Sequence, residues 1–199
     1  MKLKLYTLLG LALGLLSGPA LGQQQVKYDL SFPNAVHHEA EIKVNFSNVQ
    51  SDTLKVLMPR TSPGRYAIHE FAKNVYNVRA TDAQGQPLQI FRPNTSEWDV
   101  LGHKGQVTIS YTLFADHADG TYAGVDETHA HLNMPATLMY ARGFEQAPAS
   151  VTFNIPQGSN WKIATQLKQV QGNTYSAPNF QYLMDSPTEL SNFDFAEWM

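Results

Sequence analysis

The sequence contains no cysteine among its 199 residues. This absence excludes a disulfide framework and a thiol nucleophile. Positive charge is also scarce, because 14 Lys and Arg stand against 17 Asp and Glu and leave a net charge of −3 at pH 7. Nucleic acids and anionic membrane surfaces bind to basic patches that neutralise their charge, and no run of Lys and Arg provides such a patch. We therefore expect no nucleic-acid partner.

The motifs of hydrolytic and metal chemistry are missing as well. The zinc-peptidase motif His-Glu-x-x-His needs two histidines four residues apart on one helix face. The nearest match is His38-Glu39, and Ile42 stands where the second histidine must be. The sequence also has no Gly-x-Ser-x-Gly nucleophile turn and no phosphate-binding glycine loop. We expect no catalytic, cofactor-binding or metal-binding residue in this chain.

One histidine pair keeps a metal site open as an alternative. On a strand, His129 and His131 would point to the same face. Such a pair binds zinc when a third ligand arrives from elsewhere in the chain. The simpler interpretation is a polar loop that leads into a strand, with both histidines hydrogen-bonded or solvated.

Residues 1–22 have the pattern of a secretory signal peptide. Two lysines near the start precede an apolar stretch, and Ala20-Leu21-Gly22 places small residues at positions −3 and −1 of a cleavage site. The apolar stretch is shorter than the roughly 20 residues that span a bilayer. We expect cleavage after Gly22 and export to the periplasm or the exterior. No membrane span is expected in the mature protein, residues 23–199.

The rest of the sequence is dominated by alternating apolar and polar residues, the pattern of strands that bury one face. The alternating segments centre on residues 26–32, 40–46, 54–58, 107–113 and 151–155. Breakers rich in Pro, Gly, Asn and Asp separate them. Short helical segments are predicted only within residues 65–75 and 179–185. We expect one mainly β domain, an antiparallel β-sandwich or a curved, saddle-like sheet with one or two short helical segments.

The run of residues 58–75 departs from this alternation. Pro63-Gly64 predicts a type II turn, because Pro fixes φ and Gly accepts the positive φ of the next position. The apolar period then changes, and we expect a helical turn that buries Ile68, Phe71 and Val75. Packing and chain reversal are the favoured interpretation of the run, and direct contact with a ligand is the alternative.

This run resembles the signature of the N-terminal domain of the glycyl aminopeptidase family of zinc metallopeptidases, peptidase family M61. The family's form is Met-Pro-x-x-x-Pro-Gly-x-Tyr-x-Ile-x-x-Phe-Ala-x-Asn-Val. The matching residues here are Met58-Pro59, Pro63-Gly64, Tyr66, Ile68, Phe71-Ala72 and Asn74-Val75. Residues 28–44, 129–143 and 182–189 resemble the family's first hairpin, its central strand and loop, and its closing Leu-x-Asp-Ser-Pro-x-Glu element.

The resemblance implies a non-catalytic N-terminal β-domain. In that family the zinc-binding helix lies in a thermolysin-like domain after this one, so zinc belongs to the catalytic domain and this chain is not expected to be active alone. The resemblance implies that the domain packs on this catalytic domain and walls one side of the cleft that binds the peptide substrate. The apolar pattern of residues 193–199 reads as an unfinished strand, and we expect the natural protein to continue.

Three residues are candidates for the substrate cleft. In the related aminopeptidase N family, a loop of the N-terminal β-domain helps to hold the amino end of the substrate. By this analogy, His131 and Asn133 would offer polar contacts and Tyr122 would form a wall.

An independent secreted or periplasmic binding module for a peptide or a carbohydrate remains the alternative function. We expect Trp98, Trp161 and Trp198 to pack in the core and not to form a sugar platform.

Overall fold

The structure is a computed structural model that describes residues 23–117 and 119–196. The predicted signal peptide and Trp198 therefore lie outside the described residues. Strands dominate the fold, and the prediction of a mainly β domain with short helices is confirmed. Among the described residues, no helix is long and apolar enough to cross a membrane.

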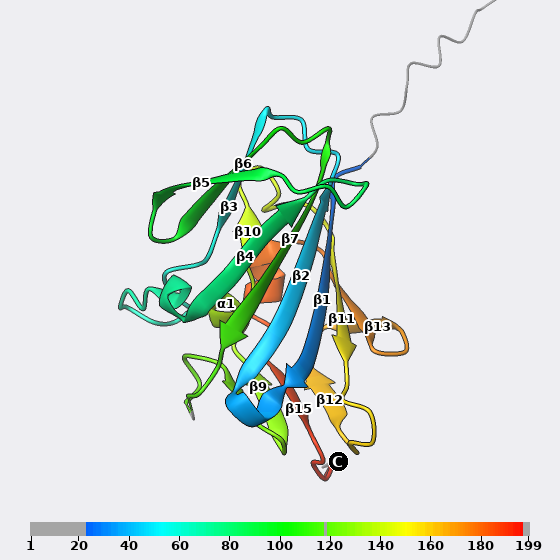
Figure 1. The fold of residues 1–199 in the computed structure, drawn as a ribbon. Helices are drawn as coiled ribbons and strands as arrows, with labels where there is room; N and C mark the ends of the chain where they lie inside the picture. Colours follow the sequence, from blue (N-terminus) through cyan, green and yellow to red (C-terminus); the bar gives the residue numbers. More distant parts are fainter. Residues whose placement is uncertain (1–22, 118, 197–199) are drawn as a thin grey trace, which may run out of the picture.

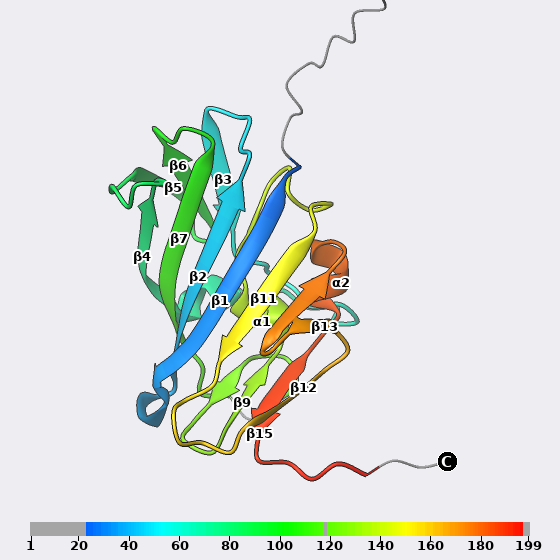
Figure 2. The same cartoon turned by 90° about the vertical axis from the view of Figure 1, so that its right-hand side faces the viewer.

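The largest sheet runs through the whole length of the molecule (Figure 1, Figure 2). Its described strands follow the order β13-β14-β11-β1-β2-β7-β4. Their bounds are β1 Gln25–Asn34, β2 Glu39–Ser47, β4 Val75–Thr81, β7 Gln106–Phe114, β11 Ala149–Asn154, β13 Lys168–Gln171 and β14 Thr174–Ala177. Neighbours are antiparallel except β1 and β11, which pair in parallel with Val26 opposite Ala149.

Two smaller sheets lie toward opposite ends of the large one (Figure 1, Figure 2). The upper sheet has the order β10-β3-β6-β5 and the lower one β12-β15-β9-β8. The upper strands are β3 Thr53–Leu57, β5 Gln89–Asn94, β6 Glu97–Leu101 and β10 Tyr140–Ala141. The lower strands are β8 Gly124–Val125, β9 His129–Leu132, β12 Lys162–Thr165 and β15 Thr188–Ser191. Short helices connect these strands, namely η1 Ala35–His37, η2 Phe71–Asn74, α1 Met134–Thr137 and α2 Phe180–Met184.

A single buried cluster joins the sheets, and the alternating residues of β1, β2 and β7 supply much of it. Trp98 and Trp161 are buried, as the sequence predicted. Buried tyrosine hydroxyls tie the segment after α1 to the large sheet. Tyr111 donates to the Thr137 carbonyl at 2.7 Å and accepts from the Met139 amide at 3.0 Å, while Tyr28 donates to the Met139 carbonyl at 2.9 Å. Burial raises the pKa of Tyr28 and of Tyr111, so both hydroxyls remain neutral donors.

The prediction of a helical turn that buries Ile68, Phe71 and Val75 is wrong in its extent. Only the 3₁₀ turn η2 forms, since Glu70 adopts a left-handed backbone with φ of 50° that separates it from the preceding residues. Phe71 is buried, whereas Ile68 is 66% exposed and Val75 is half-buried at the start of β4. The apolar pattern near the end of the sequence also forms no strand over residues 193–196.

Candidate functional site

The most unusual segment is a loop of residues 61–68, which we call the presentation loop. A polar neck closes it. The His69 amide donates to the Arg60 carbonyl at 2.8 Å, and the Arg60 guanidinium donates to the Glu70 carboxylate, with Nε 3.0 Å from Oε1. The second oxygen of Glu70 accepts from the Ser96 hydroxyl at 3.3 Å. These hydrogen bonds with Arg60, and the charge of its guanidinium, lower the pKa of Glu70, so the neck is an ion pair at neutral pH.

The tip of the loop is the predicted turn. The Arg65 amide donates to the Ser62 carbonyl at 3.0 Å, and Gly64 has a φ of +73°. A positive φ at the third position is the mark of a type II turn, and it is the reason for glycine there. The Thr61 hydroxyl donates to the Arg65 carbonyl at 3.3 Å and braces the turn. Beyond this turn, Tyr66 is fully exposed.

Two of the three predicted cleft residues lie beneath this loop. The Asn133 side chain is buried, donates to the Thr121 carbonyl, and lies 3.4 Å from the Ser62 hydroxyl. The Tyr122 hydroxyl donates at 3.2 Å to the carbonyl of His69, the residue whose amide closes the neck. Asn133 and Tyr122 therefore position the loop from below.

Tyr122 is also part of an aromatic cluster. Its ring packs edge-to-face against Phe71 with centroids 5.2 Å apart, and Lys73 lies over the ring at 4.9 Å. The same ring stacks on His117 with centroids 4.4 Å apart. This ring therefore connects the presentation loop with a second hollow that His117 lines.

The third predicted residue, His131, lies in this second hollow and not at the loop. The hollow has a volume of about 380 Å³, and its lining residues are His117, Asp119, Gly120, His129, His131 and Glu189. His131 Nδ1 is 3.3 Å from Glu189 Oε2 and His129 Nδ1 is 3.1 Å from Asp126 Oδ1. Burial raises the pKa of Asp126, but hydrogen bonds from Thr128 and His129 outweigh it and lower that pKa to about 2.

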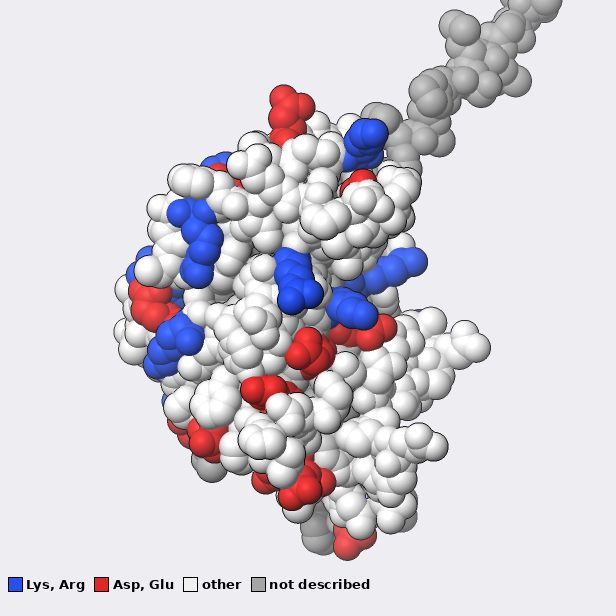
Figure 3. Space-filling view, viewed as in Figure 1, with Lys and Arg blue, Asp and Glu red and all other residues white. Residues whose placement is uncertain are grey.

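This end of the molecule is acidic. Asp and Glu gather in the lower part of the face drawn in Figure 3, whereas Lys and Arg lie higher up. Within the described ranges, no group of three or more His, Cys, Asp and Glu side chains is placed to hold a metal ion. His129 and His131 each lie beside one carboxylate, Asp126 and Glu189 respectively.

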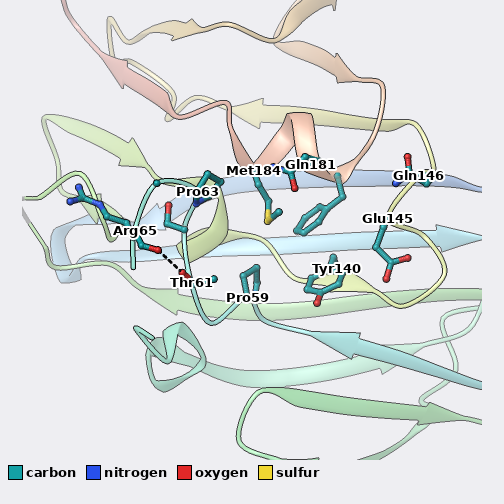
Figure 4. Close-up of a pocket in the computed structure, with 12 residues that line it drawn as sticks. Pro59, Thr61, Pro63, Arg65, Tyr140, Glu145, Gln146, Gln181 and Met184 are labelled. Carbon is teal, nitrogen blue, oxygen red and sulfur yellow. Dashed lines mark hydrogen bonds between the residues drawn. The ribbon is translucent and has the colours of Figure 1, made fainter. Parts of the chain in front are cut away.

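A groove opens beside the presentation loop. It has a volume of about 580 Å³, and its lining residues are Pro59, Thr61, Ser62, Pro63, Gly64, Arg65, Tyr140, Glu145, Gln146, Phe180, Gln181 and Met184. The loop forms one wall and α2 the other, and Glu145 lies toward one end (Figure 4). The Arg65 side chain at the opposite end points away from the groove, toward Asp119 and Gly120. Tyr140 stacks on Phe180 with centroids 4.6 Å apart and gives the groove an apolar floor.

This groove was not predicted from the sequence. Tyr140, Glu145 and Phe180 were not singled out as site residues, because no motif or spacing in the sequence connects them.

Comparison with protein families gives one match that covers most of the chain. A sequence model of the Peptidase M61 N-terminal domain matches residues 27–192. A comparison with curated proteins found no match.

Solved structures with a similar fold are longer than this chain. An aminopeptidase N family protein from Idiomarina loihiensis has a TM-score of 0.83 and 20% identity over 87% of this chain, which covers 30% of that protein. An M1 zinc metallopeptidase mutant from Deinococcus radiodurans, bound to a Tyr-Ser-Ala substrate, has a TM-score of 0.49 and 11% identity over 85% of this chain and 42% of its own. The chain therefore spans less than half the length of these two proteins.

Proposed function

Because this chain belongs to the family of Peptidase M61 N-terminal domains, we propose that it is the non-catalytic N-terminal β-domain of an exported zinc aminopeptidase. In this proposal the domain packs on a catalytic domain and walls one side of the cleft that binds peptides. The zinc of such an enzyme would belong to the catalytic domain, as the resemblance to the M61 family implies.

Two observations carry the proposal: the family match, and the small part of a longer similar protein that this chain covers. A fold that matches 87% of this chain accounts for only 30% of the Idiomarina protein. The greater part of such a protein therefore lies outside this fold and must pack against it or be linked to it. Residues 1–22 support export through their signal-peptide pattern.

The groove beside the presentation loop supports the role as a cleft wall. Its volume of about 580 Å³ is within the usual range for pockets that bind small ligands. Glu145 lies at one end of the groove (Figure 4), where its carboxylate suits the amino group of a peptide. Tyr122 and Asn133 act on the cleft through the loop they support, and His131 faces the neighbouring hollow.

The first experiment is to read the gene beyond codon 199. The proposal expects the reading frame to continue and to encode His-Glu-x-x-His within the next couple of hundred codons. A stop codon after Met199 in an intact gene would favour the alternative, an independent exported binding module. The mass of the exported protein checks the leader, because cleavage after Gly22 leaves Gln23 as the first residue.

The second experiment measures peptide turnover by the complete protein. Asn133→Ala removes the support under Ser62, so the cleft wall shifts and kcat/KM for a short peptide falls roughly tenfold or more. Asn45→Ala, which removes a hydrogen bond to Thr108 on the large sheet, is the matched control. Circular dichroism and Tm confirm that both variants fold. Unchanged turnover in a folded Asn133→Ala protein would sink the role of this loop in the cleft.

A further inference from the structure

The presentation loop combines a fixed backbone with unburied apolar side chains. Tyr66 is fully exposed and Ile68 is 66% exposed. Both residues lie between the Pro63-Gly64 turn and the neck, and hydrogen bonds close each of these two features. Scattered apolar side chains are common on protein surfaces and need no explanation. Tyr66 and Ile68 differ from such scattered side chains, because the hydrogen-bonded loop fixes the position of both before any partner binds.

The surroundings extend this apolar surface. Pro59 and Pro63 of the same segment line the groove, and Met184 of α2 faces them (Figure 4). The other large exposed apolar side chains lie on separate elements, such as Phe91 on β5 and Val170 on β13. The two exposed side chains thus belong to the same loop that forms a wall of the groove.

The two exposed side chains are suited to contact with a macromolecule and not with a small ligand. Tyr66 and Ile68 line neither the groove nor the hollow beside His131, and their high exposure shows that they project from the surface. A projecting aromatic side chain binds by entering a pocket on the partner, and tyrosine is enriched among the residues that dominate interface energies. Such a ring buries roughly 150–250 Å² when it is covered.

The neck adds a second observation. Glu70 holds a left-handed backbone without being a glycine, an arrangement that costs free energy and persists only where neighbouring contacts enforce it. The contacts with Arg60 and Ser96 enforce it here. Their effect is to turn the chain sharply between the exposed Ile68 and the buried Phe71.

We propose that Tyr66 and Ile68 are the anchor through which this domain docks on the catalytic domain of the metallopeptidase, with the tyrosine ring seated in a pocket of that domain. This inference rests on the proposed function and adds the surface that serves it. The occupant is the remainder of the longer chain, because this fold covers only 30% of the matched Idiomarina protein. A standard interface buries about 800 Å² on each side, so the rim of the groove must contribute beside the two anchors.

Site-specific crosslinking in the full-length protein tests the anchor. A photoreactive p-benzoylphenylalanine replaces Tyr66 in one sample and Phe91, which is 58% exposed on β5, in a control sample. After irradiation and proteolysis, position 66 is expected to crosslink to peptides from beyond residue 199, with at least about ten times the yield from position 91. Equal yields, or crosslinks from position 66 only to a second copy, would overturn the inference.

Substitutions give an independent measurement. The double variant Tyr66→Ser, Ile68→Ser is expected to separate the thermal unfolding of the two domains in the full-length protein and to accelerate amide exchange on the covered face. Tyr66→Phe keeps the ring and should behave as the parent protein, and Phe91→Ser serves as the surface control. Because Tyr66 and Ile68 contribute little to the core, the variants should fold. Domains that stay coupled in the double variant would contradict the anchor.

The two proposals fail in different ways. If the gene encodes a metallopeptidase domain but position 66 crosslinks no better than position 91, only the anchor is wrong. If no metallopeptidase domain follows or accompanies the chain, the proposed function is wrong, and capture of an unrelated protein would not rescue it.

Discussion

The large sheet and the presentation loop hold their shape by opposite means. In β1, β2 and β7, apolar side chains are buried on one face, and burial supplies the free energy that orders the strands. In the loop, hydrogen bonds of the neck hold the backbone while Tyr66 and Ile68 remain outside. The sheet is ordered by the burial of apolar side chains, whereas the loop is ordered by hydrogen bonds and keeps its large apolar side chains exposed. The following tests separate these two modes.

A cavity in the large sheet should have the greatest effect. Phe46 is fully buried on β2 and packs edge-to-face with Phe144, with centroids 5.4 Å apart. Phe46→Ala is expected to lower the free energy of unfolding by about 3–5 kcal/mol in urea titrations. Phe91→Ala, at an exposed position of β5, should change it by less than about 0.5 kcal/mol. Similar losses of unfolding free energy in both variants would show that burial in the large sheet is not what stabilises it.

A buried hydroxyl should matter less, but still measurably. Tyr111→Phe leaves the Thr137 carbonyl and the Met139 amide without the partner they have now. An unsatisfied buried group costs about 1–3 kcal/mol, so the midpoint of denaturation should fall. Tyr66→Phe removes a hydroxyl from the exposed loop and should leave the midpoint unchanged. A neutral Tyr111→Phe would mean that packing alone holds the segment after α1.

The neck should affect the loop without affecting the sheet. Glu70→Gln removes the ion pair with Arg60, so the loop should open more often. Amide exchange at Arg65 and His69 is then expected to accelerate, while exchange at Ile42 and Ile109 in the large sheet stays slow. Glu145→Gln, which lies outside the neck, is the matched control. Equal acceleration in loop and sheet would show that the loop is not an independent unit.

The smallest effect concerns the polar turn before β9. The pKa of Asp126 is about 2 in the folded protein, below the ordinary value near 3.9 of an unfolded chain. This carboxylate therefore contributes stability above about pH 4, and the contribution is lost as the pH falls toward 2. NMR titration should show this midpoint, and Thr128→Val should raise it. Thr95→Val, at a distant turn, should leave it in place.

The parts of the fold that depend on a local pattern were predictable from the sequence. Alternation located the strands β1, β2, β3, β7 and β11. Asn179 and Pro178 indicated the start of α2, where the Asn179 side chain accepts from the Tyr182 amide at 2.8 Å. Turn chemistry at Pro63-Gly64 was also sufficient, because the required backbone angles belong to these residues themselves.

Features that depend on partners were not predictable. Alternation assigns a face to each strand but not a neighbour, so the parallel pairing of β1 with β11 was missed. The apolar period after Gly64 counted Ile68 as buried, because a periodic pattern does not show whether any surface of the fold covers the side chain. Tyr122 and Asn133 were selected as wall and contact residues, and the structure places them together under the loop, apart from His131. Their role in the cleft remains a prediction.

The parallel pair of β1 and β11 has a consequence for how the chain is made. β1 finds its first neighbour, β2, almost at once, but its second neighbour appears only when Ala149 to Asn154 have been synthesised. Until then one side of β1 is an open edge that could pair with another molecule. The large sheet therefore cannot close early, and completion of the fold waits until most of the domain has been synthesised.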